Sequence, residues 1–576
     1  MKYIEHVKEL TRHFIKNRET ETTIAQLSVL LNCSERHSKT VMKYLHEQGH
    51  IRWVVQKGRG KKPKITVLQS NDELQLTEAK HNIQQGHYKD AFQIIQQFDS
   101  HEQADFQRWF EEYLGLSQEN TMELGNDVLR YPFYETSLIM DPPYLLSRHD
   151  AHMVQQIFDR LVEYDSVSQQ LLPRIAHHWE STDGQQWIFY LRKGVRFHHG
   201  RELTSDDVKA TFQRFPVHDL ITQNLKQIDT PSKNVIIFHL KNPNFLFPRY
   251  LSNKKASIIP IEMIEKDENF RLHPVGCGPF QLVRHDEDIV RLDVFPDYYG
   301  NRPWLDRVEI IKTPFTIHDE SKHPLLLNAP DASWREIRVQ EEGADYITFN
   351  CRKNGPMQDE RFRRFIYSIV NRADFCLRAG NEKVAYSFVT DRSMILKNRE
   401  HQPSTEYIPL DGVVKIAAQQ IRKDANHERE AFILQQQLAE HGIVSIVELI
   451  QLHELNDSLF NHYDLFVGGI ALGEDRLLSA LTASQSSSSM IYPFLTDEMR
   501  KIVDQQITII KESRTDTTRW ETYFQLESYL TTNHSLLFLT HRSHTIYEPG
   551  NSPYENIRLD RNGRIDYRKV WKQAVR

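Results

Sequence analysis

The chain has few cysteines and no long apolar stretch. Four cysteines occur in 576 residues, too scattered to form a C-x-x-C pair: Cys33, Cys277, Cys351 and Cys376. This spacing predicts reduced thiols rather than a disulfide framework or a zinc site. No run of about 18 apolar residues occurs, so no membrane-spanning helix is expected. The opening residues lack the apolar core of an export signal, so we expect a cytoplasmic protein without membrane contact.

Glycine and proline are also sparse, at 22 and 23 residues, which argues against a collagen-like or low-complexity chain. Hydrophobic residues make up 39% of the sequence, enough to form several cores. At roughly 150 residues per domain, this length predicts about four domains or lobes.

Negative charge prevails overall, but it is unevenly distributed. The net charge is −6, yet residues 1–68 contain 14 Lys or Arg and only 6 Asp or Glu, a balance of +8. The remainder therefore carries −14. A small basic head on a large acidic body indicates a polyanionic partner for the head alone.

The head has the local signals of three helices and a hairpin. Thr23 and Gln26 form a capping-box pattern for a second helix, and Ser34 is a good N-cap for a third that runs to about residue 48. Strands are expected at 51–55 and 65–68, on either side of a basic loop. This order is that of an α+β winged helix-turn-helix.

Such a head fits duplex DNA, since a polar helix can enter the major groove while a basic hairpin contacts phosphates. The alternative is a basic surface that docks a protein partner. The candidate DNA-binding residues are Ser34, Arg36, His37, Lys39, Thr40, Lys43, Lys57, Arg59, Lys61, Lys62 and Lys64.

After the head, residues 72–115 have helical apolar spacing, and we expect a helical hairpin that joins head to body. Further on, Asp183-Gly184 marks a turn before an alternating strand at 187–191. A capped helix is expected over 204–215, where two acidic residues favour the first turn.

Several stretches of the body resemble family 5 extracellular solute-binding proteins, in the order typical of that family. They are LIMDP (138–142), QIFDRLVEYD (156–165), residues 172–200, PVGCGPFQL (274–282), PDYYGNRPWLDRV (296–308), YITFN (346–350) and DERFRRFIYSIVNR (359–372). Together with the head, the AHHWE run (176–180) and the SRHDAH run (147–152) resemble SgrR-type transcriptional regulators.

The resemblance implies a multidomain protein whose body is two α/β lobes with a ligand cleft between them, like a periplasmic binding protein. The expected boundaries are 1–68 for the head, 69–118 for a helical connector and 119–576 for the body. Lobe I would comprise about 119–315 and 540–576, and lobe II about 316–539.

Residues 463–475 resemble the strand and loop that line the cleft in peptide-binding members of the family. The residues expected to bind ligand are Gly469, Ile470, Ala471, Glu474 and Asp475. Ile470 stands where that family usually has an aromatic residue, which favours a smaller or chemically different ligand over a peptide.

No catalytic or phosphate-binding motif of the G-x-S-x-G, H-E-x-x-H or Walker A type occurs. The adjacent histidines at 177–178 and 198–199 are poorly placed to chelate one ion, because neighbours on a strand point to opposite faces. We expect no enzyme activity, no metal and no cofactor.

The leading hypothesis is a ligand-responsive DNA-binding transcriptional regulator that senses a small cytosolic metabolite through the cleft. The resemblance suggests a sugar phosphate as ligand. Lobe closure on the ligand would change the affinity of the head for DNA or the recruitment of RNA polymerase, a further expected partner. The alternative is a cytosolic solute- or peptide-binding protein whose head docks a protein, without sequence-specific DNA binding.

Overall fold

The computed structural model describes most of the chain. The described residues are 4–56, 58, 61–114, 127–133, 138–145, 147–216, 219–266, 269–313, 334–379, 383–396, 412–419, 426–451, 461–549, 554–557, 559 and 564–573. Within these ranges, no helix has the length and apolar character needed to cross a bilayer.

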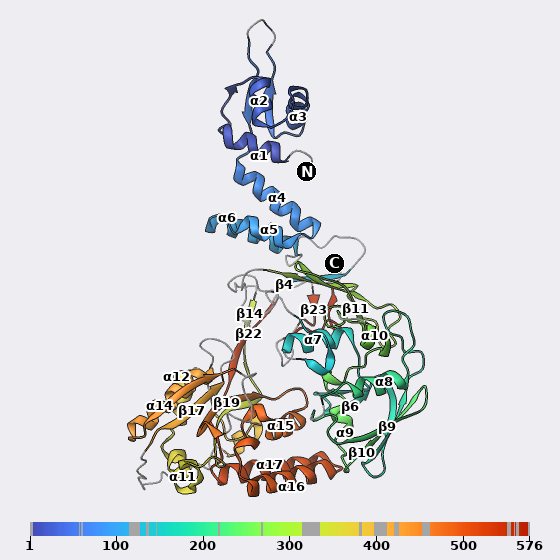
Figure 1. The fold of residues 1–576 in the computed structure, drawn as a ribbon, viewed down its shortest axis with the longest axis vertical. Coiled ribbons are helices and arrows are strands. Elements are labelled where there is room, and N and C mark those ends of the chain that lie inside the picture. The colour runs from blue at the N-terminus through green and yellow to red at the C-terminus, as the bar shows by residue number, and fades with distance from the viewer. Residues whose placement is uncertain are drawn as a thin grey trace.

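The molecule consists of a small head, a helical connector and a two-lobed body, arranged from top to bottom in Figure 1. The head and the body lie at opposite ends of the connector, so the head projects away from both lobes. This arrangement confirms the predicted fold class.

The head combines three helices with one antiparallel sheet of order β1-β3-β2. Its elements are α1 (Ile4–His13), β1 (Thr20–Glu21), α2 (Ile24–Leu30), α3 (Glu35–Glu47), β2 (Ile51–Val54) and β3 (Lys64–Val67).

Local chemistry begins and ends these helices as predicted. The backbone N–H of Gln26 donates to the Thr23 hydroxyl at 3.2 Å, completing the capping box of α2. The Ser34 hydroxyl accepts from the backbone of His37 at 3.3 Å and caps α3. Gly49 has a φ of +78°, a left-handed conformation that ends the helix and favours glycine.

The connector forms three helices rather than the expected hairpin. They are α4 (Asn71–Gln85), α5 (Tyr88–Ile95) and α6 (Ser100–Tyr113). Gly86, with a φ of +80°, ends α4 after a capping box between Ser70 and Glu73 has begun it. The hairpin prediction was wrong because the apolar periodicity of 72–115 does not reveal where the chain turns between α5 and α6.

Lobe I contains two four-stranded sheets, β7-β8-β10-β9 and β11-β12-β13-β4, and the hairpin β5-β6. Its strands are β4 (Val128–Phe133), β5 (Val162–Asp165), β6 (Gln170–Pro173), β7 (Ala176–Glu180), β8 (Gln186–Leu191), β9 (Leu225–Ser232), β10 (Val235–Leu240), β11 (Phe280–His285), β12 (Ile289–Val294) and β13 (Arg307–Lys312). Its α-helices are α7 (Arg148–Ile157), α8 (Ser205–Gln213), α9 (Phe247–Tyr250) and α10 (Ile261–Lys266).

Lobe II is built on a five-stranded mixed sheet of order β18-β17-β19-β15-β20. These strands are β15 (Gly343–Phe349), β17 (Val414–Gln419), β18 (Ser445–Ile450), β19 (Leu465–Ala471) and β20 (Leu536–Phe538). Its helices are α11 (Glu360–Ile369), α12 (Arg372–Ala379), α13 (Thr390–Leu396), α14 (Asn426–Glu440), α15 (Arg476–Gln485), α16 (Asp497–Glu512) and α17 (Asp516–Thr532). A short pair, β16 (Lys383–Val384) and β21 (Thr540–His541), adjoins the sheet.

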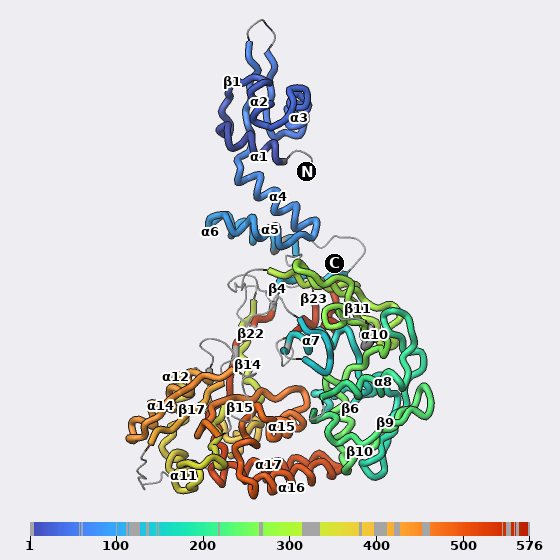
Figure 2. The backbone as a smooth tube through the Cα atoms, in the orientation of Figure 1, coloured from blue at the N-terminus to red at the C-terminus, as the bar shows by residue number. Residues whose placement is uncertain are grey.

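Two antiparallel strands carry the chain between the lobes. β14 (Trp334–Gln340) leads into lobe II and β22 (Ser543–Pro549) leads back, with Ile337 paired to Ile546. Figure 2 shows the returning chain ending beside lobe I, where β23 (Tyr554–Glu555) and β24 (Trp571–Lys572) pair. The predicted boundaries at 118–119 and 315–316 lie outside the described residues, and the domain limits remain predictions.

A buried charge cluster lies where the returning chain leaves lobe II. Asp345 of β15 and Glu430 of α14 are both fully buried. The guanidinium of Arg542, between β21 and β22, lies 3.2 Å from Asp345 Oδ1 and 3.2 Å from Glu341 Oε2. Burial and the charge of Asp345 raise the pKa of Glu430 well above its ordinary value. Burial opposes ionisation of Asp345, but Arg542 lowers its pKa, so we expect the two carboxyl groups of Asp345 and Glu430 to hold one proton, on Glu430.

We predict opposite outcomes for removing the two carboxylates. Glu430→Gln keeps a neutral hydrogen-bonding side chain and should change the melting temperature little at pH 7. Asp345→Asn leaves Arg542 with one carboxylate fewer and should cost about 3 kcal/mol. Because we expect the folded protein to retain a proton on Glu430 that the unfolded chain releases above about pH 4.5, the stability that Glu430 contributes should be lost as pH rises from there.

Calorimetric melting of the wild type and both variants at pH 5 and pH 8 measures these differences in stability. The control is Glu440→Gln, at an exposed position on the same helix. The Glu430→Gln variant should lose less stability between the two pH values than the wild type. Equal destabilisation by Glu430→Gln and Asp345→Asn would show instead that Glu430 is ionised.

Candidate functional sites

The predicted DNA-binding residues of α3 share one exposed face. Arg36, His37, Lys39, Thr40 and Lys43 are all exposed, whereas Ser38, Val41 and Leu45 of the same helix are buried. Lys43 lies 3.8 Å from Glu47, one turn further on, a weak surface ion pair. The hydroxyl of Ser34 is used as the helix cap, so its side chain is committed to positioning α3.

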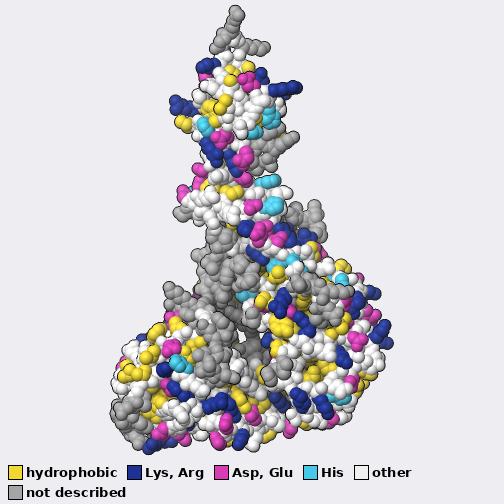
Figure 3. Space-filling view, in the orientation of Figure 1, with side chains coloured by type: hydrophobic (Ala, Val, Ile, Leu, Met, Phe, Trp, Pro, Cys, Tyr) yellow, Lys and Arg dark blue, Asp and Glu magenta, His cyan; other side chains and the backbone are white. Residues whose placement is uncertain are grey.

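The hairpin contributes further cations at the far end of the head. Lys61 and Lys62 are exposed. Lys64 pairs with Glu19 of the neighbouring segment at 2.6 Å, which reduces its availability for phosphate. Lys57 and Arg59 lie outside the described residues. Figure 3 shows Lys and Arg side chains projecting from the sides of the head.

A cavity of about 630 Å³ lies between the two lobes. All five residues expected to bind ligand line its lobe II wall: Gly469, Ile470, Ala471, Glu474 and Asp475. They come from the end of β19 and the turn before α15, so the structure brings the whole predicted set together. Binding by these residues stays a prediction.

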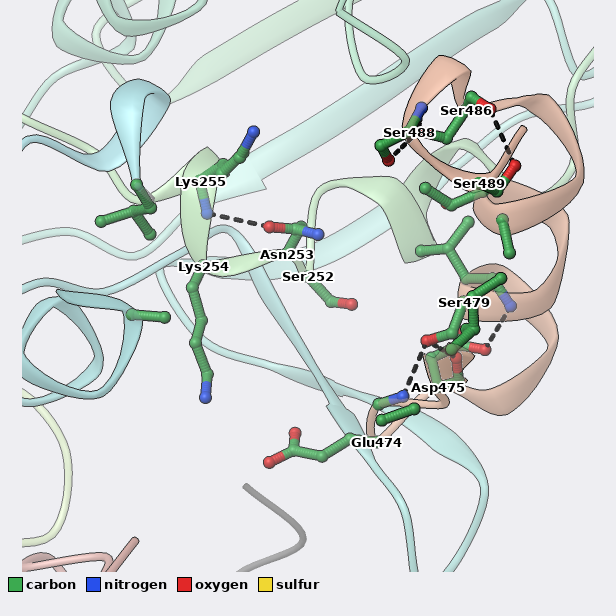
Figure 4. A pocket seen from close by; sticks show the side chains of 18 of the residues that line it. Ser252, Asn253, Lys254, Lys255, Glu474, Asp475, Ser479, Ser486, Ser488 and Ser489 are labelled. Carbon is green, nitrogen blue, oxygen red and sulfur yellow. Dashed lines mark hydrogen bonds between the residues drawn. The ribbon is translucent and has the colours of Figure 1, made fainter. Parts of the chain in front are cut away.

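The two walls differ in chemistry. The lobe II wall is rich in hydroxyls, from Ser479, Thr482, Ser486, Ser488 and Ser489. The Ser486 and Ser488 hydroxyls are 2.7 Å apart, and the Ser489 hydroxyl donates to the Ser486 carbonyl at 2.8 Å. Figure 4 shows this row facing a segment of lobe I across the cavity.

That lobe I segment supplies positive charge. Lys254 and Lys255 form a 3-10 turn that Asn253 caps, and both line the cavity. Arg160 also lines it, but its guanidinium donates to the Ser252 carbonyl at 2.7 Å and to Glu163 at 3.2 Å. The sequence reasoning missed these cations and the serines, because only their neighbours in the folded chain reveal them.

Asp475 is occupied by an ion pair between the lobes. Arg249 of lobe I donates from Nε to Asp475 Oδ2 at 2.5 Å and from a terminal nitrogen to Oδ1, and it lies 2.9 Å from Asp516. Its guanidinium also lies 4.8 Å from the centre of the Tyr164 ring. Burial alone would lower the pKa of Arg249, but Asp475 and Asp516 raise it. We call Arg249, Asp475 and Asp516 the latch.

Other contacts join the lobes beside the latch. The backbone N–H of Phe245 donates to the Lys511 carbonyl at 2.7 Å, and Arg514 donates to the Thr182 carbonyl at 2.6 Å. Arg514 also lies over the Phe245 ring at 4.5 Å. Lobe I is therefore held against α16 and α17 at the edge of the cavity. Of the two acidic residues expected to bind ligand, Glu474 is the one that does not belong to the latch.

One group in the described part of the chain has the spacing of metal ligands: Asp345, His427 and Glu430, all buried. His427 Nε2 lies 3.3 Å from Asp345 Oδ1. Arg542 already supplies positive charge there, which disfavours a divalent cation beside it. The only sequence signal for this group was the H-x-x-E spacing of α14, which places two side chains on one helix face.

Comparisons with known proteins agree with this architecture. Residues 170–489 match the model of bacterial extracellular solute-binding proteins, family 5 Middle, and residues 2–120 match the sugar transport-related sRNA regulator N-terminal domain. The structure of HbpA2 from Haemophilus parasuis shares the body fold, with a TM-score of 0.59 and 16% identity over 78% of this chain and 100% of that chain.

Two relatives cover different shares of the chain. The HTH-type transcriptional regulator SgrR of Escherichia coli K12 is 31% identical over 338 residues, which is 58% of this chain and 59% of that protein. The chain thus matches only somewhat more than half the length of that regulator. The uncharacterized protein YhjP of Bacillus subtilis is 28% identical over 87% of this chain and 88% of its own length.

These matches confirm the resemblance to SgrR-type regulators that the sequence motifs indicated. The solute-binding model alone covers more than half of the residues. The chain belongs to family 5 of the bacterial extracellular solute-binding proteins, and it carries the N-terminal domain of SgrR-type regulators in front of that module.

Proposed function

We propose that this protein is a cytoplasmic, ligand-responsive transcriptional regulator whose head binds duplex DNA and whose interlobe cavity binds a small metabolite. The observation that carries the proposal is the joining of an exposed cationic helix and hairpin to a two-lobed body with a polar cavity. The named SgrR relatives, which are HTH-type transcriptional regulators, support it.

The cavity favours a ligand that has several hydroxyls and one anionic group. Serine and threonine side chains can exchange hydrogen bonds with hydroxyls, and Lys254 and Lys255 attract a negative charge from the opposite wall. A sugar phosphate has this chemistry, and about 630 Å³ accommodates one. A peptide ligand is less suited, because Asp475 already has both oxygens engaged by Arg249.

The connector gives ligand binding a route to the head. Its aromatic core packs against Ile289 and Ile311 of lobe I, and the backbone of Lys89 donates to Asp288 at 2.7 Å. On the other side, Leu74 of α4 belongs to the head core, and Lys8 lies 2.7 Å from Glu78. Head, connector and lobe I would therefore act as one unit, against which lobe II changes position. About 1–3 kcal/mol of coupling between the two sites would make a useful switch.

The DNA-binding surface can be tested with a double variant. The double variant Arg36→Ala with Lys43→Ala should bind at least tenfold more weakly to duplexes that were selected for affinity to the wild-type protein. The reason is that two cations are removed from the recognition face. The slope of log affinity against log salt should also become shallower by about 2. Fluorescence anisotropy at two salt concentrations measures the affinity and its salt dependence. The control is the double variant Lys193→Ala with Lys226→Ala, which removes two exposed lysines of the body.

If the wild type binds selected and scrambled duplexes with equal affinity, the proposal of sequence-specific DNA binding is wrong. The head would then be a docking surface for a polyanion or an acidic protein. Unchanged binding by the double variant would show that α3 is not part of the DNA-binding surface.

The cavity can be tested with Lys254→Gln combined with Lys255→Gln. Hexose phosphates should raise the melting temperature of the wild type more than the free hexoses do, because a ligand that binds only the folded state stabilises it. The double variant should bind hexose phosphates at least tenfold more weakly. Titration calorimetry measures this, and Lys226→Gln serves as control. Stabilisation by peptides but not by hexose phosphates would contradict the assigned ligand class.

The latch can be tested by Asp475→Asn, which leaves Arg249 with Asp516 alone. We expect the lobes to separate more readily, because a buried guanidinium loses its bidentate partner. Small-angle X-ray scattering should show a larger radius of gyration than in the wild type. Glu474→Gln, the neighbouring carboxylate outside the latch, is the matched control. Identical scattering from Asp475→Asn and wild type would show that the latch does not hold the lobes together.

A further inference from the structure

Lobe II contains a second, smaller cavity of about 150 Å³. Its walls come from α11, α12, α13, α17 and β20, and it shares no lining residue with the interlobe cavity. A cavity of this size can hold a ligand about as large as benzene. Nothing in the proposed function uses it.

Two arginines line this cavity, and each lies over an aromatic ring. The Arg372 guanidinium is 4.4 Å from the centre of the Tyr386 ring, and that of Arg392 is 4.9 Å from the Phe524 ring. A guanidinium stacked by its face keeps its N–H edge available for a planar anion. Arg372 uses one nitrogen to donate to the Ala385 carbonyl at 3.1 Å.

No carboxylate among the described residues pairs with either guanidinium. The one acidic residue of the lining is Glu527, which is 5% exposed. Its oxygens accept instead from the Ser387 hydroxyl at 2.6 Å, the Phe388 backbone at 3.1 Å and the Tyr523 hydroxyl at 3.2 Å. Burial raises the pKa of Glu527 to about 7, although these hydrogen bonds and the positive charge of Arg392 oppose the rise.

Positive charge therefore exceeds negative charge around the cavity at neutral pH. Glu527 is only partly ionised, and it cannot neutralise two guanidiniums. Apart from Leu396, the remaining walls are flat rings or short hydroxyl side chains, including Tyr367, Phe538 and Ser528. Such a set fits a ligand with an anionic head and a small apolar skeleton.

We propose that this cavity is a second binding site, which takes a small organic anion whose carboxylate or phosphate group is bound by Arg372 and Arg392. The skeleton of the anion lies against the aromatic walls. The site is separate from the interlobe cavity, so the protein binds two small molecules at once.

Titration calorimetry on the full-length protein tests this with three probes: benzoate, phenyl phosphate and neutral benzyl alcohol. We expect at least one anion to bind saturably with a 1:1 stoichiometry, at least tenfold more tightly than the alcohol. The two anions distinguish a carboxylate site from a phosphate site. Arg392→Gln should weaken anion binding at least tenfold.

Three further variants locate the binding. Ser528→Trp, at an exposed position of α17, should block the cavity without removing a core contact. Arg378→Gln, an exposed arginine of α12 that donates to Gln436, should leave affinity within twofold of wild type. Lys254→Gln with Lys255→Gln should also leave it unchanged, since these lysines belong to the other cavity.

Saturable binding lost in both Arg392→Gln and Ser528→Trp supports the proposal. If Arg392→Gln does not fold, loss in Ser528→Trp alone supports it. The proposal is overturned if neither anion binds saturably, if benzyl alcohol binds as tightly, or if Ser528→Trp retains wild-type affinity. Loss of binding only in the Lys254 and Lys255 variant would place the probes in the interlobe cavity and would equally overturn it.

Discussion

The relation between the two lobes depends on one buried guanidinium, that of Arg249. Taking a cation out of water is expensive, and the cost is offset here by two carboxylates from the opposite lobe and by the Tyr164 ring. Asp475 has a second role, because it also accepts from the backbone N–H of Leu478 and caps α15. The ion pair that joins the lobes thus also fixes the helix that supplies the cavity with Ser479 and Thr482.

A second arginine, the half-buried Arg542, holds the other side of lobe II. It ties the returning chain to Asp345 of the central strand β15 and to Glu341. Gly469 lies directly above this cluster, where a Cβ atom would come within 2.0 Å of Asp345 Oδ1. Glycine is therefore required at a position that also lines the ligand cavity. Packed cores with buried ion pairs of this kind favour a few discrete lobe arrangements over continuous bending.

Local features of the chain were predictable from the sequence, and contacts between distant segments were not. The caps at Thr23 and Ser34 and the stop at Gly49 depend on residues within a few positions, so the head follows from its own sequence. Part of the lobe II wall was also predicted, because residues 463–475 resemble the strand and loop that line the cleft in peptide-binding members of the family. The partner of Asp475 was not, since Arg249 lies 226 positions away. Lys254, Lys255 and the serine row likewise meet only across the folded cavity.

The connector shows how the body can influence a head that lies at the far end of it (Figure 1). Phe92, Phe106 and Phe110 form one core with strand residues of lobe I, so the connector is an extension of that lobe rather than a loose tether. A ligand that draws lobe II towards Lys254 and Lys255 would leave the fold of the head unchanged. In the proposed function, it would change the position of lobe II relative to the head, connector and lobe I. Regulation by this route would need no rearrangement of α3.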